Sequence, residues 1–226
     1  MITPEVLYED NHLLILNKKA GTLVQGDATG DEPLVEIAKQ YVGAKYDKPG
    51  RVFMGVVHRL DRPVSGVVVF ARTSKALQRM NALFREKATT KTYYAITSQK
   101  PPYEGGTLVH WLQKDEQKNK TTAFSKETDG ALRSELSFRI IASKHDLYLL
   151  EVKPITGRPH QIRVQLASIG CPIKGDLKYG DKGANADGSI CLHARQLEFI
   201  HPVRKEPLLV KAPVPEMHPW SVFEIK

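Results

Sequence analysis

The sequence predicts an α+β protein with one mixed, mostly antiparallel β-sheet that is flanked by helices and loops. Several β-branched and aromatic runs are bounded by turn residues, and some follow one another closely enough to form hairpins. Only a few segments show the apolar spacing of an amphipathic helix. Long strands mixed with few helices are typical of the α+β class. Because 226 residues suffice for one sizeable core, we expect a single domain over residues 1–226.

The strands are predicted from the apolar runs. Val67–Phe70 has no polar break, which is the pattern of a strand buried on both faces. Residues 135–142 and 146–152 are predicted to form a hairpin around residues 143–145. The other predicted strands are two short ones around an Asp-Asn turn within residues 6–17, and those at residues 91–97, 192–200 and 208–211.

Three segments are predicted to be helices. Residues 31–42 carry apolar side chains at positions i, i+3, i+4 and i+7. Thr73 or Ser74 is a suitable N-cap for a second helix that continues to about residue 86. Pro159 suits the first turn of a third helix, which runs to residue 168 and stops at Gly170.

Residues 113–135 are the most polar part of the chain. They contain five basic and five acidic side chains and few apolar ones, so they are not a basic tail. We expect an exposed hairpin or a flexible insertion there.

The composition restricts the partners and the compartment. Lys and Arg outnumber Asp and Glu by 33 to 25, which gives a net charge of +8 and favours a polyanionic partner, nucleic acid first. A basic surface without such a partner remains an alternative. The N-terminus resembles no secretory signal and no segment has transmembrane length, so we expect a cytoplasmic protein without a membrane partner. Cys171 and Cys191 are expected to be reduced, and the scattered histidines predict no metal site.

A charged loop at residues 58–66 lies between two apolar runs. It places a single carboxylate, Asp61, among His58, Arg59 and Arg62. A loop so rich in charge on a rigid apolar frame is typical of a chemical site. An ordinary turn in which Asp61 pairs with an arginine explains the same residues, and the loop by itself does not separate the two interpretations.

The loop resembles the H-R-L-D-x-x-T-S-G signature of the RluA-type RNA pseudouridine synthases. Other segments are similar to motifs of that family in the same order, namely Asn17–Gly21, Lys91–Ala95, Gly157–Arg163, and Leu192–Ala194 with His201-Pro202. The likeness spans about residues 5–215, and several motifs in order are far more specific than one. The sequence departs from the pattern at Lys19, where proline is usual, and at Val64, where threonine is usual, while Pro159 occupies a variable position.

The resemblance implies the pseudouridine synthase fold, with its active cleft across the sheet, and a monomeric enzyme that needs no cofactor. Such an enzyme breaks the bond between ribose C1′ and uracil N1, turns the base, and rejoins it through C5. The implied substrate is a uridine in ribosomal or transfer RNA. Because the likeness starts near residue 5, we expect no N-terminal S4 RNA-binding domain. Recognition by a basic catalytic domain alone, without an S4 module, favours a compact stem-loop as the target.

The resemblance also implies three catalytic residues. Asp61 is the carboxylate beside C1′, where it attacks the sugar, stabilises its positive charge or removes a proton. Arg163 pairs with Asp61 and orients it, although its spacing alone favours a helix-surface arginine. Tyr93 stacks on uracil and assists proton transfer at C5. Since neighbours on a strand face opposite sides, Tyr94 is expected to pack on the other face.

Further side chains are predicted to contact the RNA. Arg59 is suited to fill the space that a flipped uridine leaves, although a salt bridge within the loop explains it equally well. The other predicted RNA-binding residues, for phosphates or the base, are Lys18, Lys19, His58, Arg62, Arg158 and His160.

Two other functions are compatible with parts of this pattern. An RNA-binding or RNA-folding factor with the same fold needs no catalysis, but the complete set of Asp61, Tyr93 and Arg163 argues against it. A glycosidase needs a second carboxyl group, and none appears within the matching motifs.

Overall fold

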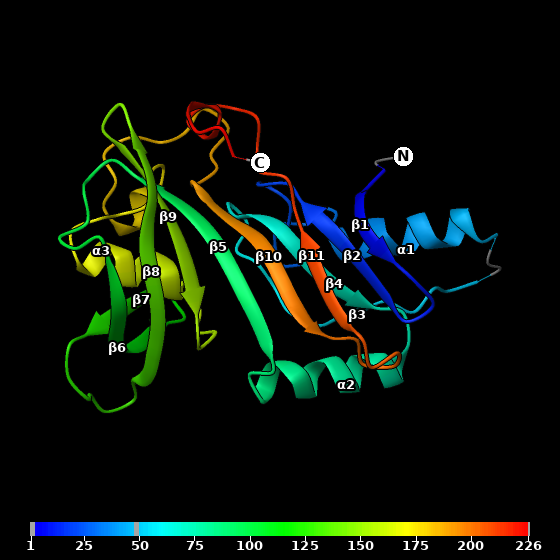
Figure 1. The fold of residues 1–226 in the computed structure, drawn as a ribbon. Helices are drawn as coiled ribbons and strands as arrows, with labels where there is room; N and C mark the ends of the chain where they lie inside the picture. Colours follow the sequence, from blue (N-terminus) through cyan, green and yellow to red (C-terminus); the bar gives the residue numbers. More distant parts are fainter. Residues whose placement is uncertain (1–2, 48–49, 226) are drawn as a thin grey trace. The chain divides into compact units, whose positions relative to one another are not determined.

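The computed structural model describes residues 3–47 and 50–225. The chain divides into two compact units, which we describe separately (Figure 1). The first unit contains residues 1–90 and 194–213, and the second contains residues 91–193 and 214–226. No helix within the described residues is long and apolar enough to cross a membrane.

The first unit is a sheet with two helices. Its strand order is β1-β2-β4-β10, while β3 pairs with β4 and β11 pairs with β10. The pairs β1–β2, β2–β4, β3–β4 and β10–β11 are antiparallel. The strands are β1 (Glu5–Glu9), β2 (Leu13–Lys18), β3 (Gly55–Val56), β4 (Ser65–Ala71), β10 (Leu192–Ile200) and β11 (Pro207–Lys211). All seven residues of β4 are buried, which confirms the strand predicted at Val67–Phe70.

Helix α2 (Ser74–Arg85) packs Ala76 and Met80 into the apolar core of this unit, against side chains of β2, β4, β10 and β11. Its N-cap is Thr73, whose hydroxyl accepts a hydrogen bond of 3.1 Å from the Ala76 amide. This confirms the predicted cap, which typically contributes about 1 kcal/mol to stability.

Helix α1 (Leu34–Lys45) begins and ends about three residues later than predicted. Pro33 has an extended ψ of 157° and serves as the N-cap, so Asp31 and Glu32 remain in the preceding loop. At the other end, Lys45 continues the helix and pairs with Glu9 at 2.7 Å. Both predicted bounds were therefore wrong, because the extended backbone of Pro33 sets the start of the helix and the ion pair of Lys45 with β1 accompanies its end.

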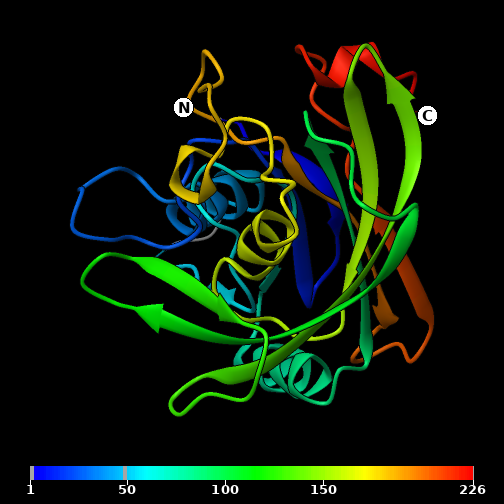
Figure 2. The ribbon, with the colours of Figure 1, turned by 90° about the vertical axis from the view of Figure 1, so that its left-hand side faces the viewer.

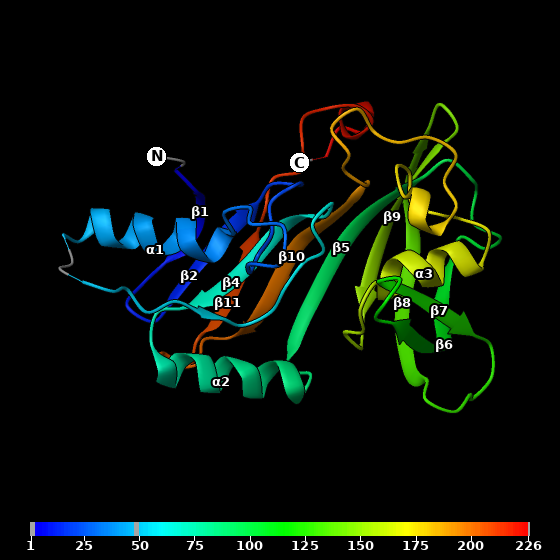
Figure 3. The ribbon, with the colours of Figure 1, turned by 180° about the vertical axis from the view of Figure 1, so that it is seen from behind.

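The second unit is an antiparallel sheet covered by one helix. Its strand order is β5-β9-β8-β6-β7. The strands are β5 (Thr89–Thr97), β6 (Gly105–Asp115), β7 (Lys120–Phe124), β8 (Leu132–Lys144) and β9 (Leu147–Pro154), of which β5 enters the unit at Lys91. Helix α3 (Gln161–Ser168) lies next to β6 and β7 (Figures 2 and 3). Two short 3₁₀ turns, η1 (Leu177–Tyr179) and η2 (Trp220–Val222), complete this unit.

The polar residues 113–135 form regular structure rather than a flexible insertion. β6 and β7 make a hairpin whose outermost pair is Asp115 opposite Lys120, and β8 begins at Leu132. The alternative of an exposed hairpin is thus the one that the structure shows.

Two predicted boundaries in the second unit shift. The β8–β9 hairpin turns at His145 and Asp146, both with positive φ, one residue beyond the centre of the predicted turn. Helix α3 starts at Gln161 rather than Pro159, because His160 has a left-handed backbone with φ of 53°. Gly170, with φ of 80°, ends the helix as predicted.

Cys171 and Cys191 are buried free thiols, and burial raises the pKa of Cys191 to about 11.

Candidate functional site

In the first unit, the loop that carries Asp61 is anchored on both sides by buried residues. Leu60 is 9% exposed and Val64 is 2% exposed, and the Val64 amide donates to the Asp61 carbonyl at 3.0 Å. Val64 therefore fills an apolar position, which accounts for valine at the site where threonine is usual. Asp61 itself is half-buried, so its carboxylate is held on a fixed turn near the surface.

Gly66 ends this loop and cannot be replaced by a residue with a side chain. Its φ is 116°, and a Cβ atom built there would lie 2.3 Å from the carbonyl oxygen of Ala194 on β10. Only glycine adopts this backbone and permits so close an approach. The glycine of the motif thus lets β4 and β10 pack tightly directly behind the Asp61 loop.

Lys18, at the end of β2, is completely buried beside the same loop. Its ammonium group donates three hydrogen bonds, to the carbonyl oxygens of Lys19 (3.1 Å), Thr22 (2.6 Å) and Arg62 (3.1 Å). Burial lowers the pKa of Lys18 to about 7, although the negative charge of Asp61 raises it. A side chain so enclosed does not reach an RNA phosphate, so the structure assigns Lys18 to loop support rather than to the contact expected from the sequence.

Arg62 makes two hydrogen bonds that connect the Asp61 loop to Gly21, in the segment after β2. Its backbone carbonyl accepts from the Gly21 amide at 2.8 Å, and its Nε donates to the Gly21 carbonyl at 3.0 Å. Its Nη2 lies 2.6 Å from Asp31, in an ion pair whose two side chains are each about half exposed. Arg62 therefore remains at the surface, where a phosphate can compete with Asp31.

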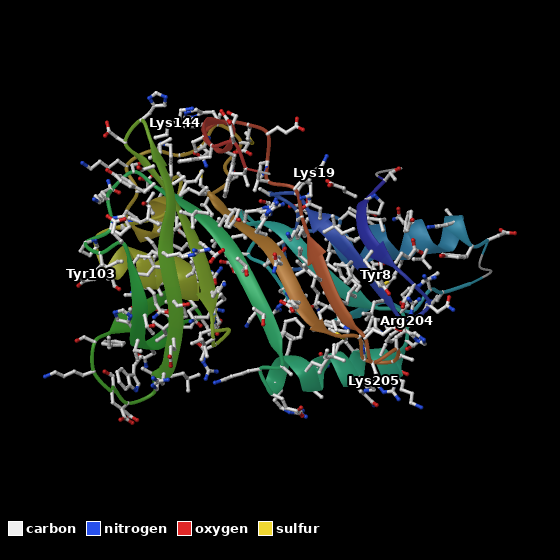
Figure 4. The ribbon with its side chains drawn as sticks, viewed as in Figure 1. Tyr8, Lys19, Tyr103, Lys144, Arg204 and Lys205 are labelled. Atoms are coloured by element: carbon white, nitrogen blue, oxygen red, sulfur yellow. The ribbon has the colours of Figure 1, made fainter. Side chains whose placement is uncertain are left out.

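His58 and Arg59 have different surroundings although they are neighbours. The His58 ring stacks on Phe84 of α2 with centroids 4.9 Å apart, and its Nε2 lies 3.2 Å from the Val69 amide. Nε2 must accept that hydrogen bond, so it carries no proton. His58 therefore braces the loop against β4 and α2, whereas Arg59 is exposed. Lys19, which stands where proline is usual, is exposed as well (Figure 4).

In the second unit, Tyr93 and Tyr94 face opposite sides of the sheet, as predicted. Tyr93 lies opposite Val152, which is fully buried, and Tyr94 lies opposite Glu151. Tyr94 also lines a shallow groove with Leu149 and the C-terminal residues 222–225. It thus belongs to the face where a packing role was expected.

The other face of this sheet, which carries Tyr93, is the one that α3 covers. The α3 face is identified by His110 on β6, whose ring nitrogens lie 3.1 Å from Gln165 Nε2 and 3.2 Å from Ser168 Oγ. His110 pairs with Ser134 on β8, which points to the same face as Phe138 four residues later. Phe138 pairs with Val152 on β9, and Val152 pairs with Tyr93 on β5, so these side chains all lie on one face. Tyr93 therefore lies on the same side of the sheet as the helix with Arg163.

Arg163 is not a surface arginine. It is 5% exposed, and its Nε and Nη2 donate to the two carboxylate oxygens of Asp176 at 2.7 and 2.9 Å. The centroid of the Tyr179 ring is 5.1 Å from the guanidinium carbon. The interpretation that its spacing alone favoured is wrong, because the polar face of this short helix turns toward a buried carboxylate.

The residues around the start of α3 are held by a polar network. Gln161 accepts from the Arg158 amide at 3.0 Å and from the Thr156 hydroxyl at 2.8 Å, and it donates to the Glu135 carbonyl at 3.0 Å. His160 Nδ1 lies 2.8 Å from the Tyr179 hydroxyl. The Arg158 side chain is exposed, so it remains available for RNA, while His160 is partly engaged.

Asp176 and Tyr179 were missed by the sequence analysis. They lie outside the matching motifs, in a short turn between Gly175 and Gly180, and both glycines have positive φ. The glycine spacing indicates a tight turn. No local pattern predicts that the Asp176 carboxylate in this turn pairs with Arg163, 13 positions earlier. Sequence-predicted residues of the first unit are thus Asp61, Lys18, His58, Arg59 and Arg62, and those of the second are Tyr93, Arg158, His160 and Arg163.

Comparison with known proteins gives consistent matches over most of the chain. Residues 12–168 match a family described as RNA pseudouridylate synthase. Ribosomal large subunit pseudouridine synthase C of Vibrio cholerae is 33% identical over 221 residues, which cover 92% of this chain and 65% of that protein. Its Escherichia coli namesake is 32% identical over 224 residues, covering 93% and 66%. The chain thus spans about two thirds of the length of these relatives.

A solved structure shows the same fold. Human RNA pseudouridylate synthase domain containing 4 superposes with a TM-score of 0.77 at 24% identity, covering 93% of this chain and 88% of that one. This confirms the α+β fold that the sequence predicted.

Proposed function

Because this chain belongs to the RNA pseudouridylate synthase family, we propose that it converts uridine to pseudouridine at specific sites in structured RNA. The observation that carries the proposal is the family match over residues 12–168, which includes the Asp61 loop, Tyr93 and Arg163. The names of the relatives refer to the large ribosomal subunit, so ribosomal RNA is the first candidate substrate and transfer RNA the second.

The reaction requires no cofactor, because it is balanced within the substrate and the protein. One C–N bond at ribose C1′ breaks, one C–C bond to C5 forms, C5 loses its proton, and N1 gains one, either the same proton or one exchanged with solvent. No electrons are gained or lost, and no water is consumed. The protein has to hold the separated base, stabilise the charge on the sugar, and move one proton.

Asp61 is the group proposed to act at the sugar. Its loop is fixed by buried neighbours, and the Lys18 amino group lies close enough to interact electrostatically with Asp61. An ionised carboxylate beside C1′ can attack the carbon, stabilise its positive charge or remove a sugar proton. Each of these roles requires the acid and is lost with the amide.

Tyr93 and Arg163 are proposed to serve the base and the carboxylate. The Tyr93 ring, on the α3 side of β5, is suited to stack on uracil, and its hydroxyl to assist proton transfer at C5. Arg163 has five N–H donors, and Asp176 uses two of them, on Nε and Nη2. The role proposed for the other donors is to orient Asp61, as the resemblance to the family implies.

RNA binding is proposed to depend on exposed cations. Arg59, Arg62 and Arg158 are exposed, and a net charge of +8 attracts the phosphate backbone. A uridine in a helix hides both C1′ and C5, so it must leave the stack before it reacts. Arg59, two residues before Asp61, is suited to occupy the vacated space.

Hydrolysis of the glycosidic bond is less well supported. Asp176 is a buried carboxylate near the start of α3, but both of its oxygens accept hydrogen bonds from Arg163. Because both oxygens are engaged by the guanidinium, neither is placed to protonate a leaving group, as a glycosidase acid must.

The Asp61→Asn variant tests this function. RNA labelled with tritium at uridine C5 releases the label when pseudouridine forms, so we expect release by the wild type and none by the variant. RNA affinity is expected to change by less than about tenfold, because the phosphate contacts remain. Substantial turnover by the variant contradicts the role of Asp61. RNA binding without any release by the wild type points instead to an RNA-binding factor that has the fold but no catalysis.

A further inference from the structure

The turn at residues 175–181 is a rigid support within the second unit. The Asp176 amide donates to the Ile173 carbonyl at 2.9 Å, and the Gly175 amide donates to the Asp181 carboxylate at 2.7 Å. The amides of Tyr179 and Asp181 both donate to the Asp176 carbonyl at 3.1 Å. These bonds fix the backbone on which Asp176 and Tyr179 stand.

Asp176 holds one edge of the Arg163 guanidinium. The two parallel hydrogen bonds of 2.7 and 2.9 Å form a planar, two-point contact, and the side chains are only 1% and 6% exposed. Such a contact fixes both the position and the plane of the guanidinium. Burial removes competing water, so the pair keeps one geometry.

Tyr179 holds one face of the same group. Its ring lies over the guanidinium at 5.1 Å, within the range of a cation–π contact. The ring itself cannot swing, because its hydroxyl accepts from the Thr121 amide at 2.8 Å and lies 2.8 Å from His160 Nδ1. Thr121 in turn donates to the Pro159 carbonyl at 3.0 Å. β7 and the segment before α3 thus fix the ring over Arg163.

We propose that Asp176 and Tyr179 are positioning residues that orient Arg163 for the reaction. With Nε and one Nη2 hydrogen bound to Asp176 and one face covered by Tyr179, the plane and rotation of the guanidinium are fixed, and with them the directions of its other N–H groups. A preoriented cation needs no reorganisation when charge develops during the reaction. This inference rests on the proposed function, since it assigns to Arg163 the role of orienting the catalytic carboxylate.

The inference predicts that loss of the Asp176 contact lowers kcat but leaves RNA binding nearly unchanged. Asp176→Asn keeps the shape of the side chain but replaces one acceptor oxygen by an amide donor, so the two-point contact is lost. We expect kcat to fall by about 10²-fold, while KM and RNA affinity change by less than about threefold. Asp181→Asn is the matched control, because it makes the same chemical change in the same turn without touching Arg163, and its amide oxygen can still accept the hydrogen bond from the Gly175 amide. It is expected to retain kcat within about threefold of the wild type.

A double-mutant cycle distinguishes positioning from general support. If Asp176 acts through Arg163, then Asp176→Asn causes little further loss of kcat in an Arg163→Lys background. Losses that multiply in the double variant, or an unchanged kcat in Asp176→Asn, overturn the inference while the proposed function stands. Tyr179→Phe, which keeps the ring but releases its hydroxyl, is expected to lower kcat less than Tyr179→Leu. The two Tyr179 variants test the inference independently if Asp176→Asn fails to fold.

A measurement without activity completes the test. In the wild type and in Asp181→Asn, the Nε–H proton of Arg163 is expected to give a sharp NMR signal that exchanges slowly with water. In Asp176→Asn the signal is expected to broaden or disappear while the protein remains folded, although its melting temperature falls because a buried ion pair is broken. A persistent sharp signal in that variant overturns the inference. A wild type that is inert on RNA contradicts the proposed function instead, and the NMR comparison still decides whether Asp176 fixes Arg163.

Discussion

At the scale of single residues, Lys18 shows how burial changes the role of a charge. A lysine next to a charged loop suggests a phosphate contact, but this one is fully enclosed and donates to three backbone carbonyls. These carbonyls come from two segments about 40 positions apart in the sequence, residues 19–22 and Arg62. Lys18 therefore joins two motifs and places a positive charge near Asp61.

We predict that Lys18→Met destabilises the protein without weakening the phosphate contacts. The methionine fills a similar volume but leaves buried carbonyl groups without donors, which costs about 1–3 kcal/mol for an unsatisfied group. Urea denaturation measures this loss, and the salt dependence of RNA binding is expected to keep its slope. The matched control is Lys19→Met, on the exposed neighbour, for which we expect a change in stability within about 0.5 kcal/mol. Equal stability of the two variants contradicts the assignment.

The stability difference between the wild type and Lys18→Met is also expected to depend on pH. Burial lowers the pKa of Lys18 from 10.5 to about 7, so between these values the unfolded state binds more protons than the folded state. The free energy of unfolding of the wild type therefore gains from Lys18 as pH rises above 7. Denaturation at pH 7, 8 and 9 is expected to show the gap to Lys18→Met widening. A gap that narrows contradicts the lowered pKa.

At the scale of elements, β5 divides its two tyrosines between two different environments. The register with β9 places Tyr93 with the buried Val152 on the α3 side and Tyr94 with Glu151 on the other. The strand alternation that predicts this separation needs no knowledge of the rest of the fold. Which side carries α3, by contrast, follows only from the contacts of that helix with β6.

We predict that Tyr93→Phe and Tyr94→Phe differ strongly in turnover. Tyr93→Phe keeps the ring for stacking but removes the hydroxyl, so tritium release is expected to fall by about 10²-fold or more, as for the loss of a general acid or base. Tyr94→Phe is expected to stay within about threefold of the wild type. Greater damage from Tyr94→Phe means that the wrong face of β5 has been chosen.

At the scale of the whole molecule, the excess of basic side chains determines how RNA binding responds to salt. Release of counterions from the phosphates makes the logarithm of the affinity fall linearly with the logarithm of the salt concentration. Several phosphate contacts are expected to give a slope of several units. A short stem-loop that carries the target uridine is expected to show this slope and to be modified nearly as well as the full RNA.

Single substitutions at exposed arginines test which cations contribute to this slope. Arg59→Gln and Arg158→Gln are each expected to reduce it by about one unit, measured by titration at several salt concentrations. Lys18→Met serves as the buried control with an unchanged slope. A slope near zero for the wild type contradicts phosphate binding. If the full-length RNA is modified but the isolated stem-loop is not, only the prediction of a compact target is contradicted.

Local patterns in the sequence were sufficient to predict the fold class, most strands and the family. Unbroken apolar runs identified β4, alternation separated Tyr93 from Tyr94, and β10 was predicted with its observed bounds, Leu192–Ile200. These features are local, because side-chain periodicity depends only on neighbouring residues. The motif order then pointed to the family that the comparisons confirm.

Which charged groups are buried, and with which partners they pair, follows from the three-dimensional fold. The left-handed backbone of His160 delays the start of α3, and the turn at residues 175–181 brings Asp176 onto Arg163. The carbonyls that enclose Lys18 likewise converge from separate segments. A residue's burial and its pairing depend on chain segments far away in the sequence, and no local pattern of residue types records where those segments meet.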